Sequence, residues 1–545
     1  MNQFFNNHNN IVPEALSGLL KSSNTDLYLL DALPHTKCVI RKDWDKSKVA
    51  ILSGGGAGHE PAHAGFVGAG MLTGAISGEI FASPSVDAIL AAILQVTGEK
   101  GCLLVIKNYT GDRLNFGLAA ERAKNLGLNV EMLIVKDDIS IPDSKQPRGI
   151  AGTLFIHKVA GYLSESELSL DEIKEHLDLL NSKIYSIGIA YSSCSLPGIK
   201  KEVRQEAELG LGIHGEPGVE KILPKSAQQS MNIVIDQLSE ALSTTDTKIG
   251  VLLNNLGSTS NLEMLVLMND LLSSSLAPRI EWVFGPQSYM TALNMHGFSI
   301  SIVELNADTT TALLAPTEVN TWIPGTAIRE VELVPLNQAV KQPVFVRSKN
   351  GLMEKLVNGL CDLLITQEAY LNELDSKVGD GDTGMTFANG ARAVIEAHLS
   401  HGLPLDNPDE LFLTIGNQLS TAMGGSSGVL LSIFFTSAGN AYQSNGSIAM
   451  SFSIALNAVM KYGGARLGDR TMLDAAIPAI AAWNKGRPLI DIVQAATDGA
   501  NGTAEILKAN AGRSSYLRSD SLKGIKDPGA VAIALMFQEA ANLLT

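Results

Sequence analysis

Short apolar runs alternate with helical patterns over roughly the first 335 residues of the chain. The runs are rich in Val, Ile and Leu, and several end close to Gly, Asn or Pro. The stretch 114–128, like others between the runs, has apolar residues at helical spacing. Strands that alternate with helices predict an α/β domain with a largely parallel sheet. The predicted strands are 49–53, 102–106, 130–135, 184–191, 250–254, 280–284 and 300–305.

The pattern changes after residue 350. Segments rich in Ala, Leu and Met keep helical spacing there, and no convincing strand separates them. The predicted helices lie near 350–374, 386–400, 409–422, 427–443, 449–462, 471–484, 488–508 and 529–543. The stretch 336–350 is mostly polar and has no helical period, so we interpret it as a linker. The sequence therefore predicts an α/β domain over 1–335 and an all-α domain over 351–545.

Composition narrows the class of partner. The chain has 545 residues and a net charge of −15, without long basic runs, which argues against nucleic acid as a partner. Phosphorylated substrates are compatible with this charge, because backbone amides, helix N-termini and metal ions hold phosphates locally. The N-terminus is polar rather than signal-like, and no apolar stretch approaches the roughly 18 residues that span a bilayer. We expect a cytoplasmic protein without a membrane partner.

A glycine-rich segment follows the first strong strand. Residues 53–61 read SGGGAGHEP, and the glycines there let a ligand approach the backbone closely. No Lys-Ser or Lys-Thr pair follows, so the segment is not a P-loop, and its spacing fits a dinucleotide fold poorly. A tight structural turn is the alternative. The presence of His59 favours a functional role, because imidazole exchanges protons near neutral pH.

Two further segments carry candidate chemistry in the first half. Residues 107–112 read KNYTGD after the next strong strand, which gives a polar group with Lys107 and Asp112 at a strand end. Asp112 could accept a hydroxyl proton, or could cap the helix that follows. Residues 208–218 read ELGLGIHGEPG and set His214 between small residues. That histidine is either a hydrogen-bonded structural residue or a nucleophile toward a carbonyl carbon.

The second half carries a cluster of carboxylates. Residues 375–384 read DSKVGDGDTG, and Asp375, Asp380 and Asp382 repel one another unless a hard cation neutralises them. Magnesium that bridges to phosphate oxygens is the natural interpretation, and a solvated acidic turn is the alternative. The ligand spacing does not fit an EF-hand loop.

Other glycine-containing segments of the second half have the composition of nucleotide contacts. Residues 423–428, MGGSSG, precede an apolar helix, and amides and hydroxyls at a helix N-terminus suit a phosphate. Residues 463–472, GGARLGDRTM, are predicted to form a flexible lid over a nucleotide. The segments 510–513 and 527–529 either line a nucleotide pocket or form simple turns.

Taken in order, these segments resemble the single-chain, ATP-dependent dihydroxyacetone kinase family, and the resemblance covers essentially the whole chain. SGGGAGHEPAHAGF, KNYTGDRLNFGLA, GIHGEPG, KVGDGDTG, MGGSSGVL and GDRTM occur in the family's order. The resemblance implies an α/β substrate-binding domain, followed by a nucleotide domain built as a barrel of antiparallel helices. It also implies phosphorylation of dihydroxyacetone by ATP with Mg²⁺ in a homodimer, with glyceraldehyde and erythrulose as further candidate substrates.

The resemblance implies roles for individual residues as well. His214 matches the histidine that forms a hemiaminal with the ketone, and His59 and Asp112 match the acid/base pair for the reacting hydroxyl. The residues that match the dihydroxyacetone contacts are Gly56, Ala57 (where many members have Ser), Gly58, His59, Lys107 and Asp112. The magnesium ligands match Asp375, Asp380 and Asp382. The nucleotide contacts match Thr383, Gly384, Met385, Thr386, Ser426, Ser427, Gly464, Thr471, Met472, Arg513, Asp527, Pro528 and Gly529.

Three other functions are compatible with parts of the pattern. A ketone-binding regulator without turnover needs the first half alone, so the aspartate cluster argues against it. A phosphotransfer-system enzyme with bound ADP usually has its two domains on separate chains, so the fusion favours free ATP. The third is a lyase that forms cyclic FMN, an activity that some fused relatives of this kind show.

Overall fold

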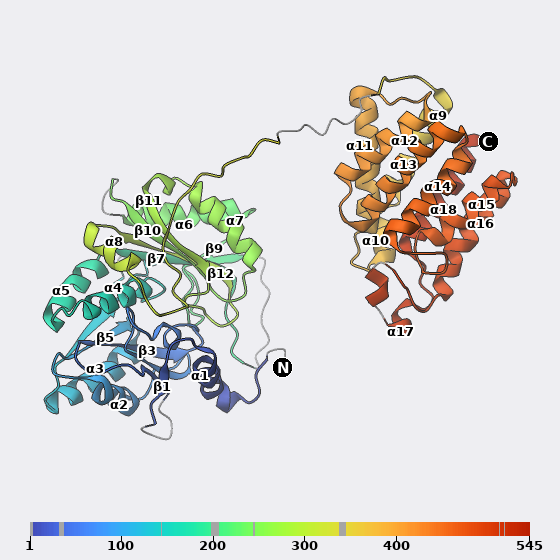
Figure 1. Cartoon of the computed structure of the whole chain (residues 1–545). Coiled ribbons are helices and arrows are strands. Elements are labelled where there is room, and N and C mark those ends of the chain that lie inside the picture. Colours follow the sequence, from blue (N-terminus) through green and yellow to red (C-terminus); the bar gives the residue numbers. More distant parts are fainter. Residues whose placement is uncertain are drawn as a thin grey trace. The chain divides into compact units, whose positions relative to one another are not determined.

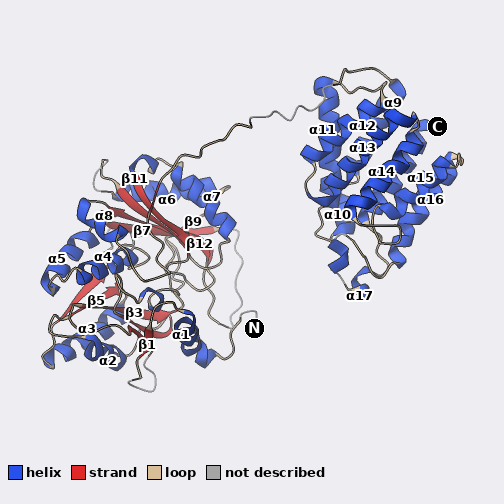
Figure 2. Ribbon diagram, viewed as in Figure 1, coloured by secondary structure: helices blue, strands red, loops and turns tan. Residues whose placement is uncertain are grey.

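The computed structural model describes residues 4–31, 37–142, 144–197, 206–242, 246–336, 345–511, 513–516 and 518–545. The chain divides into two compact units, Met1–Leu333 and Val334–Thr545. The first unit contains strands and helices, whereas the described residues of the second form helices but no strand (Figures 1 and 2). The predicted fold classes are therefore confirmed. Most of the predicted linker, residues 337–344, lies outside the described residues.

The first sheet of the α/β unit has parallel strands at its centre and an antiparallel edge. Its order is β1-β2-β4-β3-β5-β6, with β4, β3, β5 and β6 parallel. Alternate side chains of β3 and β5 enter two separate core clusters, one with helices α2 and α3 and the other with α4 and α5. The bounds are β1 (Leu27–Leu29), β2 (Cys38–Arg41), β3 (Ala50–Ala57), β4 (Gly74–Ile80), β5 (Cys102–Lys107), β6 (Val130–Val135), α2 (Val86–Val96), α3 (Thr110–Asn125), α4 (Thr153–Glu165) and α5 (Leu170–Asn181).

The second sheet of this unit is largely antiparallel. Its order is β13-β11-β10-β12-β7-β8-β9, and only the β10–β11 pair among the described strands is parallel. Helices α6 and α7 share a core cluster with one face, and α8 packs on α4. The bounds are β7 (Ile184–Ser192), β8 (Ala207–Leu209), β9 (Glu220–Ile222), β10 (Ile249–Asn255), β11 (Ile280–Gln287), β12 (His296–Glu304), β13 (Thr326–Ala327), α6 (Ala227–Ala241), α7 (Asn261–Leu272) and α8 (Ala307–Leu314).

The prediction of a largely parallel sheet holds for the centre of the first sheet and is wrong for the second. All seven predicted strands are present, as β3, β5, β6, β7, β10, β11 and β12. The sequence of a strand such as β10 does not reveal whether its neighbours are parallel or antiparallel. The strand is buried on both faces, so it is one continuous apolar run in either case. The sequence pattern misses β1, β2, β8, β9 and β13, which have two to four residues each, and the glycine-containing β4.

The second unit is a ring of helices. Neighbouring contacts run from α9 through α11, α12, α13, α14, α15, α16 and α18 and return to α9, which closes the ring. The predicted helix near 350–374 is two helices, α9 and α10, and the short α17 is not predicted. The bounds are α9 (Gly351–Thr366), α10 (Glu368–Asp375), α11 (Thr383–His401), α12 (Pro408–Ala422), α13 (Gly425–Asn445), α14 (Ile448–Gly463), α15 (Leu473–Asn484), α16 (Leu489–Gly502), α17 (Ser519–Leu522) and α18 (Pro528–Leu544).

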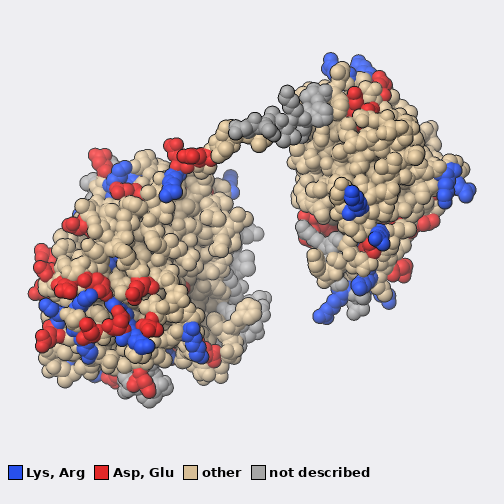
Figure 3. Space-filling view, in the orientation of Figure 1, with Lys and Arg blue, Asp and Glu red and all other residues tan. Residues whose placement is uncertain are grey.

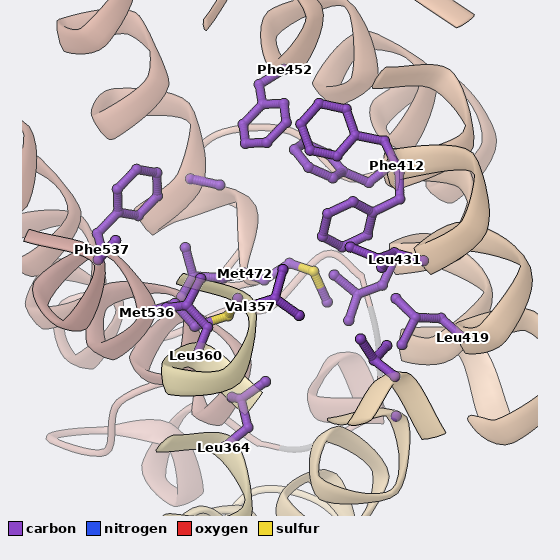
Figure 4. A pocket seen from close by; sticks show the side chains of 18 of the residues that line it. Val357, Leu360, Leu364, Phe412, Leu419, Leu431, Phe452, Met472, Met536 and Phe537 are labelled. Atoms are coloured by element: carbon purple, nitrogen blue, oxygen red, sulfur yellow. The ribbon is translucent and has the colours of Figure 1, made fainter. Parts of the chain in front are cut away.

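The ring encloses an apolar cavity of about 330 Å³. Aliphatic, aromatic and methionine side chains from facing helices point into it, among them Val357, Phe412, Phe452 and Met536 (Figure 4). The helical barrel that the family resemblance implies is thus confirmed. None of the helices in the described ranges is long and apolar enough to cross a membrane.

The surface of the α/β unit mixes charges of both signs. On the face drawn in Figure 3, Lys and Arg side chains lie among Asp and Glu over the part that carries α2, α3 and α5. Arg122 pairs with Asp87, and Lys174 pairs with Asp178. The described basic side chains on this face therefore do not gather into a patch of one sign.

Helix α4 packs closely on the segment before β4, so we expect a larger side chain at this contact to destabilise the α/β unit. A Cβ at Gly161 would overlap the backbone of Met71, which cannot move without displacing the first sheet. We expect Gly161→Ala to lower the free energy of unfolding of the α/β unit by about 1–3 kcal/mol. Gly117 on α3 is the matched control, because a Cβ there meets no atom within 4 Å. We expect Gly117→Ala to raise stability by about 0.5–1 kcal/mol in the same urea titration, and equal losses in both variants would contradict the packing argument.

Candidate functional site

His214 lies between β8 and β9, at the edge of the second sheet, and three aromatic rings from other segments surround it. The ring centroids of Tyr109, His59 and Phe81 lie 4.4, 4.8 and 5.3 Å from the centroid of its imidazole, all edge-on. Its side chain is 17% exposed, so part of the imidazole is accessible to a small ligand. His59 and Tyr109 directly follow β3 and β5. The carboxyl ends of two parallel strands therefore meet the second sheet here, where ligands bind in many α/β folds.

Glu216 orients the imidazole of His214. One carboxylate oxygen of Glu216 accepts the backbone N–H of His214 at 3.0 Å, and the other lies 3.5 Å from Nδ1. Burial acts to raise the pKa of Glu216, but the hydrogen bonds and charge interaction with His214, together with a backbone hydrogen bond of Glu216 itself, hold that pKa below its ordinary value. An ionised carboxylate beside Nδ1 favours the tautomer with the proton on Nδ1. The lone pair of His214 is then on Nε2, as a nucleophile requires.

His59 is a fully buried neutral base. Its Nδ1 lies 2.7 Å from the carbonyl oxygen of Thr291, which can only accept, so Nδ1 carries the proton. Its Nε2 therefore has a lone pair, and that atom has no hydrogen-bond partner among the described residues. Burial, together with the nearby Lys107 and His214, lowers the pKa of His59 well below its ordinary value. The imidazole is therefore neutral, and its Nε2 lone pair can accept a hydrogen bond but has no proton to give.

Lys107 and Asp112 border the same side of the glycine-rich strand end. A Cβ placed on Gly55 would lie 3.0 Å from Nζ of Lys107 and 3.5 Å from one carboxylate oxygen of Asp112. Both side chains are buried. Desolvation lowers the pKa of Lys107, and the negative charges of Asp112 and Asp137 oppose this shift. Asp112 lies within the first turn of α3, whose N-cap is Tyr109, so Asp112 does not serve as the cap.

The three residues before His59 shape the backbone. β3 continues to Ala57, so the predicted glycine-rich loop is the end of the strand itself. A Cβ on Gly56 would lie 2.7 Å from backbone atoms of Phe81, and Ala57 belongs to the core. Gly58 has φ +101° and donates its N–H to Glu60 at 2.9 Å. The structure thus brings His59, Lys107, Asp112 and His214 together, while the small residues let their segments pack closely.

The helical unit has a large polar pocket of about 1040 Å³. Asp375, Asp380 and Asp382 line it, and one carboxylate oxygen of each lies within 4.8 Å of the others. One oxygen of Asp375 also accepts the backbone N–H groups of residues 381, 382 and 383 at 3.0–3.1 Å. Three carboxylates at this spacing, all oxygen donors, fit a hard divalent cation such as Mg²⁺.

Most of the residues predicted to contact a nucleotide line this pocket. They are Thr383, Met385, Thr386, Ser426, Ser427, Thr471, Met472, Asp527, Pro528 and Gly529. Two predicted glycines are not lining residues: Gly384 packs on the backbone of Glu368, and Gly464 ends α14 with φ +75°. The side chain of Arg513 lies outside the described part of the chain. Asn389, Tyr462 and Arg470 also line the pocket. Arg470 belongs to the segment predicted as a lid, whereas no local sequence pattern singles out Asn389 or Tyr462.

The segment predicted as a flexible lid is braced. Asp474 accepts the backbone N–H groups of Gly468 and Thr471 at 2.5 and 2.7 Å. Asp469 accepts the N–H of Arg466 at 2.7 Å and the side-chain amide of Asn510 at 2.8 Å. These bonds hold residues 463–472 as a wall of the pocket. The N-terminus of α13 also lines the pocket, and its N-cap residue, Gly424, has no side chain to cap the first amides, so these can meet an anion.

In comparisons with known sequences, two different family models match the two halves of the chain. A Dak1 domain matches residues 18–321, and a DAK2 domain matches residues 377–542. Dihydroxyacetone kinase of Citrobacter freundii is 46% identical over 545 residues, which is 99% of each chain. The triokinase/FMN cyclase of Homo sapiens is 37% identical over 564 residues, which is 97% of each chain.

Solved structures give the same result. The dihydroxyacetone kinase of C. freundii in complex with AMP-PNP and Mg²⁺ matches with a TM-score of 0.72 and 44% identity over 99% of each chain. A dihydroxyacetone kinase operon co-activator matches 57% of this chain and 98% of its own, with a TM-score of 0.54 and 30% identity. Because both domains match and the identity extends over the full length, the chain belongs to the dihydroxyacetone kinase family.

Proposed function

We propose that this chain phosphorylates dihydroxyacetone with ATP and holds the ketone as a hemiaminal on His214. The observation that carries the proposal is the pairing of His214 with the ionised Glu216, beside the buried base His59. A kinase that acted only on polyols would need no nucleophile at this position. The full-length similarity to the dihydroxyacetone kinase of C. freundii supports the same activity.

Capture of the ketone follows from the tautomer of His214. The lone pair on Nε2 adds to the carbonyl carbon, and the carbonyl π bond breaks. The resulting alkoxide takes up one proton and Nδ1 releases one, so in net a single proton passes from Nδ1 to the former carbonyl oxygen. Glu216 relays this proton through solvent and ends ionised as it began, and the adduct carries no net charge. Glycerol has no carbonyl carbon, so this step selects ketones and aldehydes over plain polyols.

Proton transfer and binding then depend on the groups around Gly55. Asp112 accepts the proton of the terminal hydroxyl that attacks the γ-phosphorus, and Nε2 of His59 is the second acceptor. Lys107 donates a hydrogen bond to an oxygen of the bound ketone. All three side chains are buried, so water competes little with these contacts.

The pocket of the helical unit fits ATP. Asp375, Asp380 and Asp382 would hold Mg²⁺, which neutralises charge on the phosphates when it is bound. Ser426, Ser427 and the amides that open α13 receive phosphate oxygens. Phosphoryl transfer depends mainly on positioning and charge neutralisation, which this arrangement provides.

A second activity is favoured by one set of relatives. Triokinase/FMN cyclases align with 97% of this chain at 37% identity, so formation of cyclic FMN from FAD is a candidate side reaction. Incubation with FAD and Mn²⁺, followed by chromatography for cyclic FMN, tests it.

A regulator without turnover is less well supported, because the co-activator relative covers only 57% of this chain and so has no counterpart of the remainder. We expect a cytoplasmic homodimer, and light scattering would measure its mass.

Replacement of His214 tests the covalent anchor. We expect His214→Ala to lose the ketone adduct in native mass spectra and to lower kcat/KM for dihydroxyacetone on the order of 100-fold or more, because the nucleophile is gone. His176→Ala, at an exposed histidine on α5, is the control and should leave both readouts unchanged. The assay panel of dihydroxyacetone, glyceraldehyde, erythrulose and glycerol also sets the substrate range. An adduct that persists in His214→Ala would disprove the anchor.

Replacement of Asp380 tests the cation site. Asp380→Asn removes one of three anionic ligands at an exposed position, so we expect Mg²⁺-dependent AMP-PNP affinity to fall at least about tenfold. Calorimetric titrations with and without Mg²⁺ measure this change. Glu373→Gln is the matched control, because Glu373 is a nearby exposed acid that pairs with Lys377. Unchanged Mg²⁺ dependence in Asp380→Asn would remove Asp380 from the site.

A further inference from the structure

A chain of buried polar side chains lies beneath Lys107. Nζ of Lys107 is 2.7 Å from Nε2 of His63, and Nδ1 of His63 is 3.3 Å from the hydroxyl of Ser53. That hydroxyl is also 3.1 Å from Nε2 of His157 on α4. None of these four side chains is more than 4% exposed. The sequence pattern does not single out His63 or His157, and the proposed mechanism does not use them.

One hydroxyl proton fixes the proton positions in the chain. The Ser53 hydroxyl lies 2.7 Å from the carbonyl oxygen of Val105, which can only accept, so its single proton goes there. Ser53 must then accept from both imidazoles, which puts protons on Nδ1 of His63 and Nε2 of His157. Nε2 of His63 is left with its lone pair facing the ammonium of Lys107.

Both histidines are neutral, and Lys107 is the only cation among these four side chains. Burial, together with the charge of Lys107, lowers the pKa of His63 well below its ordinary value and that of His157 to about 3. An ammonium has three N–H donors and no acceptor. One donor is used on His63, which leaves two for Asp112 and for a ligand beside Gly55.

We propose that His63 is a positioning residue: it accepts one N–H of Lys107 and thereby aims the ammonium at the ketone site. The inference rests on the proposed function, in which Lys107 donates to an oxygen of the ketone. A long, flexible lysine side chain needs such a fixed acceptor if its charge is to be oriented before the ligand arrives. Ser53 fixes the tautomer of His63, because its hydroxyl proton is committed to Val105.

The ionisation of Lys107 gives a readout beyond stability. The groups that face it are Asp112 on α3, Asp137 after β6, the histidines His59 and His63 after β3, and His157 on α4. Burial sets the pKa of Lys107 below its ordinary value of 10.5, so ketone binding should weaken as pH rises through that lowered pKa. Loss of the acceptor on His63 removes a hydrogen bond that favours the ammonium. The alkaline limb of the pH profile of kcat/KM for dihydroxyacetone should therefore move to lower pH.

Three variants of the full-length chain separate positioning from packing. His63→Phe keeps a planar ring but has no acceptor, His63→Gln keeps a neutral acceptor, and His157→Phe alters the same chain without touching Lys107. We measure kcat and KM for dihydroxyacetone and for ATP between pH 6 and 10, and urea stability for each variant. For His63→Phe we expect kcat/KM for dihydroxyacetone to fall on the order of tenfold to 100-fold, with an unchanged KM for ATP and a limb at lower pH. His63→Gln should restore most of the activity, and His157→Phe should keep the wild-type limb.

The outcomes divide cleanly. Equal losses in His63→Phe and His157→Phe, with the alkaline limb unmoved, would show a packing role and overturn the inference. Failure of His63→Gln to differ from His63→Phe would do the same. If His63→Phe does not fold, His63→Met takes its place, since it also lacks a strong acceptor. A wild-type chain that binds AMP-PNP but does not phosphorylate dihydroxyacetone would contradict the proposed function itself, and this inference with it.

Discussion

The hydrogen bonds between residues 58–60 and residues 291–293 join the two sheets of the α/β unit, and the proposed ketone site depends on this junction. Leu293 donates its N–H to the carbonyl of Gly58 at 2.8 Å, and Thr291 donates its N–H to the carbonyl of His59 at 3.2 Å. The same Thr291 accepts from the ring of His59. The short loop between β11 and β12 therefore fixes both the position of His59 and the nitrogen that carries its proton. Because His214 comes from the edge of the second sheet, the junction also brings His214 beside His59.

A buried site with several ionisable groups is stable only if few of them are charged. Here three histidines, His59, His63 and His157, are kept neutral by burial and by the charge of Lys107. Their ring nitrogens are instead assigned as donors or acceptors by a backbone carbonyl or a serine hydroxyl. Among Lys107 and these three histidines, the positive charge is thus confined to Lys107, opposite Asp112 and Asp137. The neutral imidazoles accept or donate directed hydrogen bonds, while the ammonium of Lys107 carries the charge of this group.

The sequence predicts features that are local along the chain and misses those that join distant segments. Strands at 49–53 and 102–106 correctly put His59 and Lys107 at strand ends, and the clustered acids near 380 are a local pattern. The role of His214 comes only from the ordered family motifs, since a lone histidine has no such signal. The tautomer of His59 depends on Thr291, which is 232 residues away, and no periodicity contains that contact. Glu216 is within two residues of His214, but its effect depends on the turn that folds its carboxylate back.

The acidic cluster of the helical unit solves a related problem with backbone amides in place of imidazoles. Three carboxylates that converge in one pocket repel one another, and this repulsion disfavours the folded unit until a cation arrives. Asp375 offsets part of that cost, because one of its oxygens accepts the amides of residues 381, 382 and 383, where the chain enters α11. Three N–H dipoles that point at one oxygen stabilise its charge as well as fixing the side chain. Asp375 is thus buried and held by three backbone amides, whereas Asp380 is exposed. A cation that accompanies the nucleotide can therefore reach the cluster from solvent while one of its ligands is already held in place.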